Sequence, residues 1–145
     1  MAVLWFDGLL ARVEDAGVYF LPEPDVDELL EAASVNAFPC LRANLRGCHD
    51  RADLLLRIAG VFDMPPHVVR DWEALPGALE RLRDEGAAGQ VLLLEDSQDL
   101  RAAAPDEFKR AMETLQAISA DWAGRGLAFW SFVVMDEAEF DALDD

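Results

Sequence analysis

The sequence predicts a single α/β domain with a small, mainly parallel sheet and helices packed on it. Segments with strand character alternate with segments of helical periodicity along the 145 residues, and no linker rich in Gly, Pro or Ser divides them. Residues 91–94 are apolar at every position, which is typical of a strand covered on both faces in a parallel sheet. A chain of this length also fits one domain with a sizeable core. We therefore expect one domain over residues 1–145.

The N-terminal part of the chain predicts a strand–helix–strand unit, preceded by one more short strand. Residues 2–6, 18–21 and 38–45 are rich in aromatic and branched side chains, which favour strands. Asp25 and Glu28 have the spacing of a capping box, so a helix is predicted to begin at Asp25. The buried face of this helix is predicted to consist of Val26, Leu29, Leu30 and Ala33. Such a unit is expected to wind right-handed.

Two further helices and a last strand are predicted in the remainder of the chain. Asp50 precedes one helix, and Pro105 with the two acids after it opens a longer one. Their buried faces are predicted to consist of Leu54, Leu55, Ile58, Ala59 and Phe62, and of Phe108, Met112, Leu115, Ile118 and Trp122. Residues 127–134 predict the last strand, and residues 136–145, which carry acids and no bases, predict a frayed tail.

Residues 64–82 contain two adjacent prolines, a short polar loop and then apolar residues at helical spacing. One face of the predicted helix is formed by Trp72, Leu75, Leu79 and Leu82. Trp72 heads this stripe and is interpreted as a core anchor, with contact to a partner as the alternative. Pro76 has no N–H group, so it either breaks a helix already under way at Asp71 or starts a new one.

The formal net charge of the chain is −17. The phosphates of nucleic acids and anionic membranes would repel so acidic a chain, and no basic stripe compensates. The charge therefore indicates either a basic partner or a means of solubility. No apolar run approaches the roughly 18–20 residues of a membrane span, and the first residues lack the features of a signal peptide. We expect a cytoplasmic protein that binds neither nucleic acid nor membranes.

The residue patterns of the common catalytic and cofactor sites are missing from the sequence. No GxSxG, GxxxxGK[ST] or GxGxxG motif occurs. His49 adjoins Asp50 at a helix entrance, where a capping or surface role is expected. Cys40 and Cys48 form no zinc pattern, and both thiols are expected to be reduced and buried. We therefore expect no metal, no cofactor and no catalysis.

Four pieces of the sequence occur in an order and spacing that resemble a known family. They are LRGCHDRADLLLRIAGVFDMP, DWEAL, GQVLLLEDSQDLRAAAPDEFKRAMETL and DWAGRGLAFWSFVV. From about residue 41 to residue 134 the chain resembles the barstar family, the intracellular protein inhibitors of secreted ribonucleases. On this resemblance residues 1–40 are an N-terminal extension, 41–135 the family core and 136–145 an acidic tail. The resemblance implies a recognition loop and helix whose acidic side chains take the place of substrate phosphates in a basic active site.

The recognition segment of the family matches this chain in part. Pro65, Trp72, Ala74 and Leu75 fit its pattern, and Asp71 and Glu73 stand where the family carries Asn and Asp. The aromatic pair of the family is replaced by His67 and Val68, and its glycine by Val69, which does not easily adopt a positive φ. Gly77 stands where the family usually carries a further acidic residue, so the expected central carboxylate is missing.

The resemblance implies a set of partner-binding residues, and each has a plainer alternative. The set consists of Pro66, His67, Arg70, Asp71, Glu73, Gly77, Glu80 and Asp121. Asp71 and Glu73 fit a solvated helix start equally well, because acids there oppose the helix dipole favourably. His67 is alternatively an exposed loop residue and Glu80 part of a solvated face, while Asp121 falls near a second acidic contact of the family.

We expect a monomeric, barstar-like inhibitor that binds the basic active site of a ribonuclease or related toxin, as its immunity partner. The alternative is a barstar-fold protein-interaction domain that has lost nuclease inhibition and uses its N-terminal extension as the interface. A hydrolase is the weakest of the three hypotheses, because it would need a pocket with a perturbed titratable group.

Overall fold

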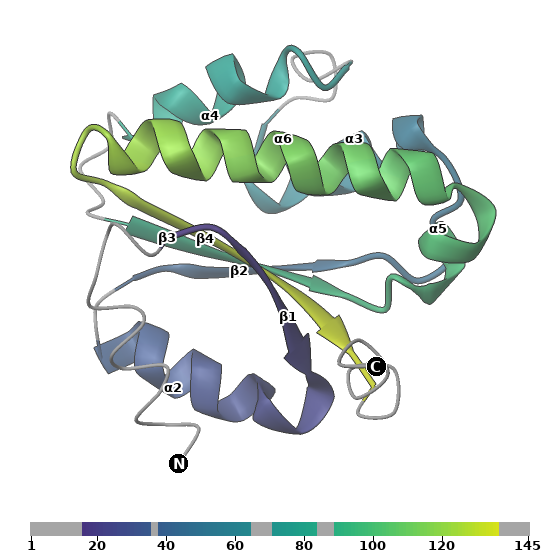
Figure 1. Ribbon diagram of the computed structural model, residues 1–145, viewed down its shortest axis with the longest axis horizontal. Coiled ribbons are helices and arrows are strands. Elements are labelled where there is room, and N and C mark those ends of the chain that lie inside the picture. Colours follow the sequence, from purple (N-terminus) through teal and green to yellow (C-terminus); the bar gives the residue numbers. More distant parts are fainter. Residues whose placement is uncertain (1–15, 36–37, 65–70, 84–88, 137–145) are drawn as a thin grey trace.

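The computed structural model describes residues 16–35, 38–64, 71–83 and 89–136, which form a three-layer arrangement (Figure 1). A twisted sheet lies in the middle, with α3, α4 and α6 on one face and α2 on the other. The predicted mixed α/β class with a parallel sheet is confirmed. The predicted strand over residues 2–6 and most of the acidic tail lie outside the described residues. No described helix combines the length and the apolar character needed to cross a membrane.

The sheet has four parallel strands in the order β1-β4-β3-β2. Their bounds are Val18–Pro22 for β1, Cys40–Asn44 for β2, Gly89–Glu95 for β3 and Ala128–Met135 for β4. All four were predicted to within two residues at each end. The strands β1 and β2 lie at opposite edges, so the predicted N-terminal strand–helix–strand unit spans the whole sheet. The helix α2 (Val26–Val35) therefore crosses the face that the other helices leave open.

Two apolar cores lie on the two faces of the sheet, and β4 contributes to both. Phe129 and Val133 pack against α3, α4 and α6, whereas Trp130 and Phe132 pack on the α2 side. Tyr19 of β1 extends the second core, with its ring 5.8 Å from Phe132 and 6.1 Å from Trp130. Successive side chains of a strand point to opposite faces, so a strand between two cores is buried on both faces and mostly apolar. This is why residues 91–94 showed no alternation of apolar and polar residues.

The starts of α3 and α6 follow the sequence signals, whereas the start of α2 does not. In α3 (Arg51–Val61) the Asp50 carboxylate accepts a hydrogen bond of 2.8 Å from the backbone N–H of Asp53, as an N-cap does. The helix α6 (Pro105–Ala123) begins at its proline, as predicted. The capping box predicted at Asp25 is wrong, because Glu23–Asp25 already form a short 3-10 helix that runs directly into α2. The short helix α5 (Gln98–Ala103) was not predicted.

The helix α4 (Leu75–Arg83) begins later than its apolar spacing predicted. Residues 71–74 form a turn, and the helix starts at Leu75 with Pro76 as its second residue. Proline is tolerated there because the N–H groups of the first helical turn have no partner within the helix. Of the two alternatives for Pro76, the start of a new helix is therefore the one observed. Trp72 and Leu75 are buried in the core, which confirms the interpretation of Trp72 as a core anchor.

Both cysteines are free, as predicted. Cys48 is buried, but Cys40 is only partly buried, which corrects the expectation that both are fully buried. Burial raises the pKa of both thiols, so they stay protonated at neutral pH and are weak nucleophiles.

Candidate partner-binding face

Four of the eight predicted contact residues can be placed in full. Asp71, Glu73 and Gly77 lie at or near the turn over residues 71–74, and Asp121 lies near the end of α6. Three others, Pro66, His67 and Arg70, lie outside the described residues, and of Glu80 only the backbone position in α4 is described.

The turn is stabilised from within by Asp71. The Asp71 Oδ1 atom accepts a hydrogen bond of 2.9 Å from the backbone N–H of Ala74, and the Asp71 carbonyl oxygen lies 3.3 Å from the same nitrogen. An aspartate that bonds to backbone a few residues on is a common turn-forming device. This hydrogen bond supports the interpretation of Asp71 as a structural residue of the turn that precedes α4. Its side chain is nevertheless exposed.

The next residue, Trp72, fastens the turn to α6. Its side chain is only 3% exposed, and its indole Nε1 donates a hydrogen bond of 2.9 Å to Oε2 of Glu107. A buried indole N–H needs such a partner, and a charged acceptor makes a strong one. The turn is thus held against the first turns of α6 by an apolar anchor with a fixed orientation.

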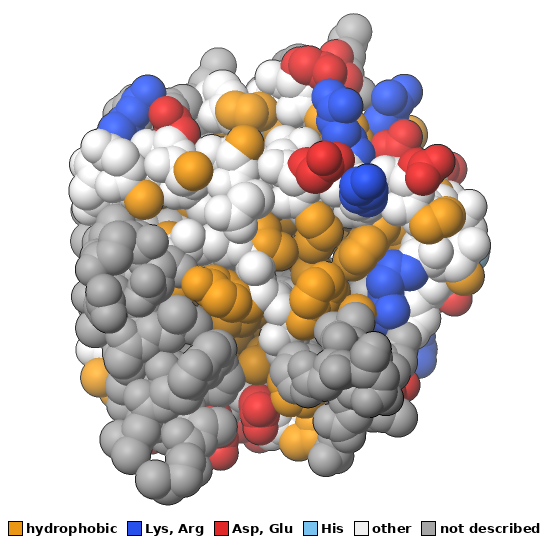
Figure 2. All heavy atoms as spheres, viewed as in Figure 1, with side chains coloured by type: hydrophobic (Ala, Val, Ile, Leu, Met, Phe, Trp, Pro, Cys, Tyr) orange, Lys and Arg blue, Asp and Glu red, His pale blue; other side chains and the backbone are white. Residues whose placement is uncertain are grey.

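Glu73 points away from the core and forms an ion pair with α6. Its Oε1 atom accepts a hydrogen bond of 2.9 Å from Nη2 of Arg110, and the two side chains are 72% and 51% exposed. Exposed ion pairs are worth only about 0–1 kcal/mol, because water competes for both charges. The Glu73 carboxylate is therefore accessible to another cation at little cost. Figure 2 shows basic and acidic side chains close together on this part of the surface.

A continuous hollowed face joins Glu73 to Asp121. One hollow of about 310 Å³ contains Glu73, Pro76 and Arg110 in its lining, and a second of about 160 Å³ contains Pro76 and Asp121. Pro76 and Ala117 line both hollows, so the two carboxylates flank the same stretch of surface between α4 and α6. Asp121 is about half exposed and lies 3.6 Å from Nη2 of Arg125. We call the surface formed by Glu73, Pro76, Ala117 and Asp121 the α4–α6 face.

Gly77 is an uncharged, exposed residue that follows Pro76 of this face in the sequence. A Cβ atom placed on it would meet no atom within 4 Å. The first turn of α4 contains no acidic residue. The glycine is therefore not required by close packing, and a side chain would project into open space.

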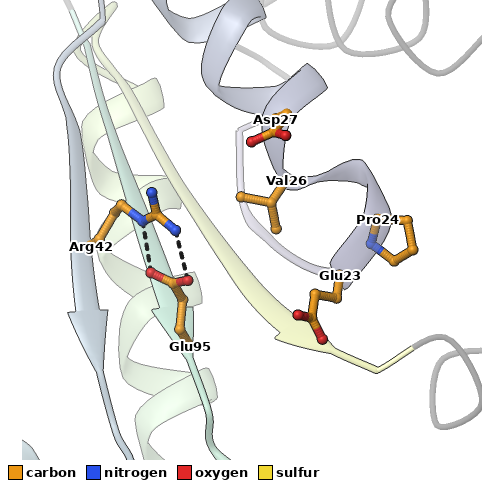
Figure 3. A pocket seen from close by; sticks show the side chains of 6 residues that line it. All are labelled: Glu23, Pro24, Val26, Asp27, Arg42 and Glu95. Carbon is orange, nitrogen blue, oxygen red and sulfur yellow. Dashed lines mark hydrogen bonds and ion pairs between the residues drawn. The ribbon is translucent and has the colours of Figure 1, made fainter.

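A larger hollow of about 550 Å³ lies on the opposite side of the sheet, beside the first turn of α2 (Figure 3). Across β2 and β3, Arg42 donates two hydrogen bonds of 2.7 and 2.8 Å to the Glu95 carboxylate. These bonds raise the pKa of the Arg42 guanidinium, which stays charged. Glu23 and Asp27 approach from the α2 side. The sequence carries no local signal for this hollow, because the start of α2 and the strands β2 and β3 that line it are distant in sequence.

The described residues contain no group of three or more His, Cys, Asp and Glu side chains that could hold a metal ion. His49 is exposed and next to the N-cap of α3. The chemistry that this face offers is therefore the presentation of carboxylates on a rigid support.

Comparison with protein families identifies the chain. The sequence model of barstar, described as "Barstar (barnase inhibitor)", matches residues 38–134. Searches of the curated proteins and of the solved structures found no match. The matched region begins just before β2 and ends within β4, so it contains the whole α4–α6 face and leaves out β1 and α2. It covers well over half of the chain, and the protein therefore belongs to the barstar family.

Proposed function

We propose that this protein inhibits a basic ribonuclease, or a related toxin, by placing its α4–α6 face in the active site. The observation that carries the proposal is that Glu73 and Asp121, far apart in the sequence, flank one hollowed surface within the region matched by the barstar family. The partner is thus a protein with a positively charged cleft. We expect the inhibitor to act as a monomer in the cytoplasm, as the immunity partner of that nuclease.

Electrostatics support a basic partner. A ribonuclease cleft presents Arg, Lys and His to the phosphates of RNA, and carboxylates on a rigid turn present the opposite potential. The net charge of −17 adds long-range attraction, which speeds the encounter of oppositely charged proteins. The anchoring of Trp72 by Glu107 keeps the turn in place before binding, so little ordering is needed when the partner arrives.

The open position at Gly77 supports the alternative function. A barstar-fold domain without a carboxylate at the centre of its recognition helix fits an interaction domain that no longer inhibits a nuclease. Its interface would then lie elsewhere. In the N-terminal extension, β1 and α2 bury Leu21 and Leu29 in the second core but leave Phe20 and Val35 exposed, so apolar surface for such an interface remains there.

Titration of barnase with this protein in an RNA-cleavage assay tests the proposal. The variants Glu73→Gln and Asp121→Asn remove one charge each without changing shape, and each is expected to weaken inhibition about tenfold. The variant Glu31→Gln, an exposed position of α2 on the other face of the sheet, is the matched control and should leave inhibition unchanged. If the wild type inhibits barnase and none of the three variants changes this inhibition, the α4–α6 face is not the binding site.

A second test of this face adds a carboxylate, at Gly77, instead of removing one. The variant Gly77→Asp is expected to tighten binding to barnase about tenfold, because the new side chain enters open space next to Pro76 of the face that we propose meets the basic cleft. Its folding should not suffer, since an acid in the first turn of α4 is favoured by the helix dipole. The neutral variant Gly77→Asn controls for shape. Equal affinities of the two variants would show that charge at this position is irrelevant.

A further inference from the structure

Two residues of α6 hold two successive residues of the recognition turn. Glu107 accepts the hydrogen bond from Trp72, and Arg110, three residues later on the same face of the helix, donates one to Glu73. The first contact lies at the edge of the core and fastens the turn. The second lies in solvent, where its two side chains are 72% and 51% exposed.

The second contact is therefore not needed to position the turn. Trp72 is anchored by its own burial and its bond to Glu107, and Asp71 closes the turn on Ala74. Because the Glu73–Arg110 pair is exposed, breaking it leaves the backbone supported on both sides of Glu73.

The position of Arg110 conflicts with the charge of the expected partner. Its guanidinium lines the same hollow as Glu73, together with Glu113 and Pro76. A cation of the partner that approaches Glu73 meets a charge of its own sign already bound there, and such like-charge contacts oppose association.

We infer that Arg110 is a specificity-determining residue that competes with the partner for Glu73. This inference rests on the proposed function. It defines the partner more closely: the partner must carry a guanidinium or ammonium group that replaces Arg110 at Glu73, while Glu113 in the same hollow offers the displaced Arg110 another acceptor. Basic proteins whose cations do not reach Glu73 leave its charge paired with Arg110 and gain no direct attraction from it.

The experiment measures binding to barnase by stopped-flow and calorimetry at low salt. Barnase, as a basic protein not selected against this chain, is expected to bind Arg110→Gln about threefold or more tightly than the wild type, because the competing charge is gone. Arg42→Gln is the matched control, since it removes the same charge from another exposed ion pair, with Glu95, on the other face of the sheet. Its effect should be clearly smaller. In a Glu73→Gln background, the effect of Arg110→Gln should fall to the level of the control.

The outcomes separate this inference from the proposed function. If wild-type binding depends on Glu73 but Arg110→Gln binds no better than Arg42→Gln, Arg110 is not a competitor, and the proposed function stands. Weaker binding by Arg110→Gln would show that Arg110 orients Glu73 and would overturn the inference. If Arg110→Gln binds barnase where the wild type does not, the inference holds. If no variant binds, both proposals fail for this nuclease.

Discussion

Replacement of Leu29 by alanine is expected to lower the free energy of unfolding by about 3 kcal/mol, as for other fully buried leucines. Leu29 lies in α2, outside the region matched by the barstar family, and is completely buried in the second core. The loss combines the transfer energy of the removed groups with the cavity that remains between α2 and the sheet. Urea unfolding followed by circular dichroism measures the change.

Leu56→Ala is the matched control for this prediction. The chemical change is the same, but Leu56 lies on the outer face of α3 and is 49% exposed, so the expected loss is below about 1 kcal/mol. A similar small loss at both positions would show that α2 is not part of the cooperative fold. The N-terminal segment would then be a separable appendage rather than one layer of the domain.

The double variant Glu73→Lys with Asp121→Lys is expected to weaken inhibition of barnase at least about a hundredfold. Both side chains are exposed on the α4–α6 face, and each reversal replaces an attractive contact by a repulsive one in the basic cleft, where like charges cost several kcal/mol. Most of the loss should appear at low salt and diminish at high salt, because the Debye length falls from roughly 10 Å at 0.1 M to 3 Å at 1 M salt.

The control carries the same change of net charge on the other face of the sheet. Asp27→Lys with Glu31→Lys reverses two exposed carboxylates of α2. In this control variant only the long-range electrostatic effect on binding should remain. We expect it as a modest fall in the rate of association with barnase. Equal losses in the two double variants would show that net charge alone drives binding and that the α4–α6 face has no special part in it. Thermal unfolding of each variant checks that its fold is intact.

Local signals determined much of the fold in advance. The continuous apolar run of β3 predicted a strand covered on both faces. Asp50 and Pro105 predicted the starts of α3 and α6. These signals depend on residues close in sequence, through side-chain periodicity and the unpaired N–H groups of a first helical turn. The same kind of signal misled at Asp25, where two prolines favoured a 3-10 turn over a cap.

The candidate site could be predicted only as a set of residues. The sequence placed Asp71 and Glu73 at a helix start and identified Asp121 by resemblance. It did not show that Asp71 would close a turn, or that Arg110 would reach Glu73 across a separation of 37 residues. Glu107 and Arg110 have the spacing of neighbours on one helix face. No local sequence pattern, however, predicts that they bind Trp72 and Glu73.

The sequence by itself determined the α/β class, the barstar resemblance and the acidic character of the molecule, because these follow from local periodicity, composition and motif order. Tertiary structure alone decided that β1 and β2 occupy opposite edges, that α2 covers the second face, and that Glu73 and Asp121 flank one surface. The physical reason is that strand order and ion pairing are set by which distant segments bury each other, and burial is a property of the assembled chain.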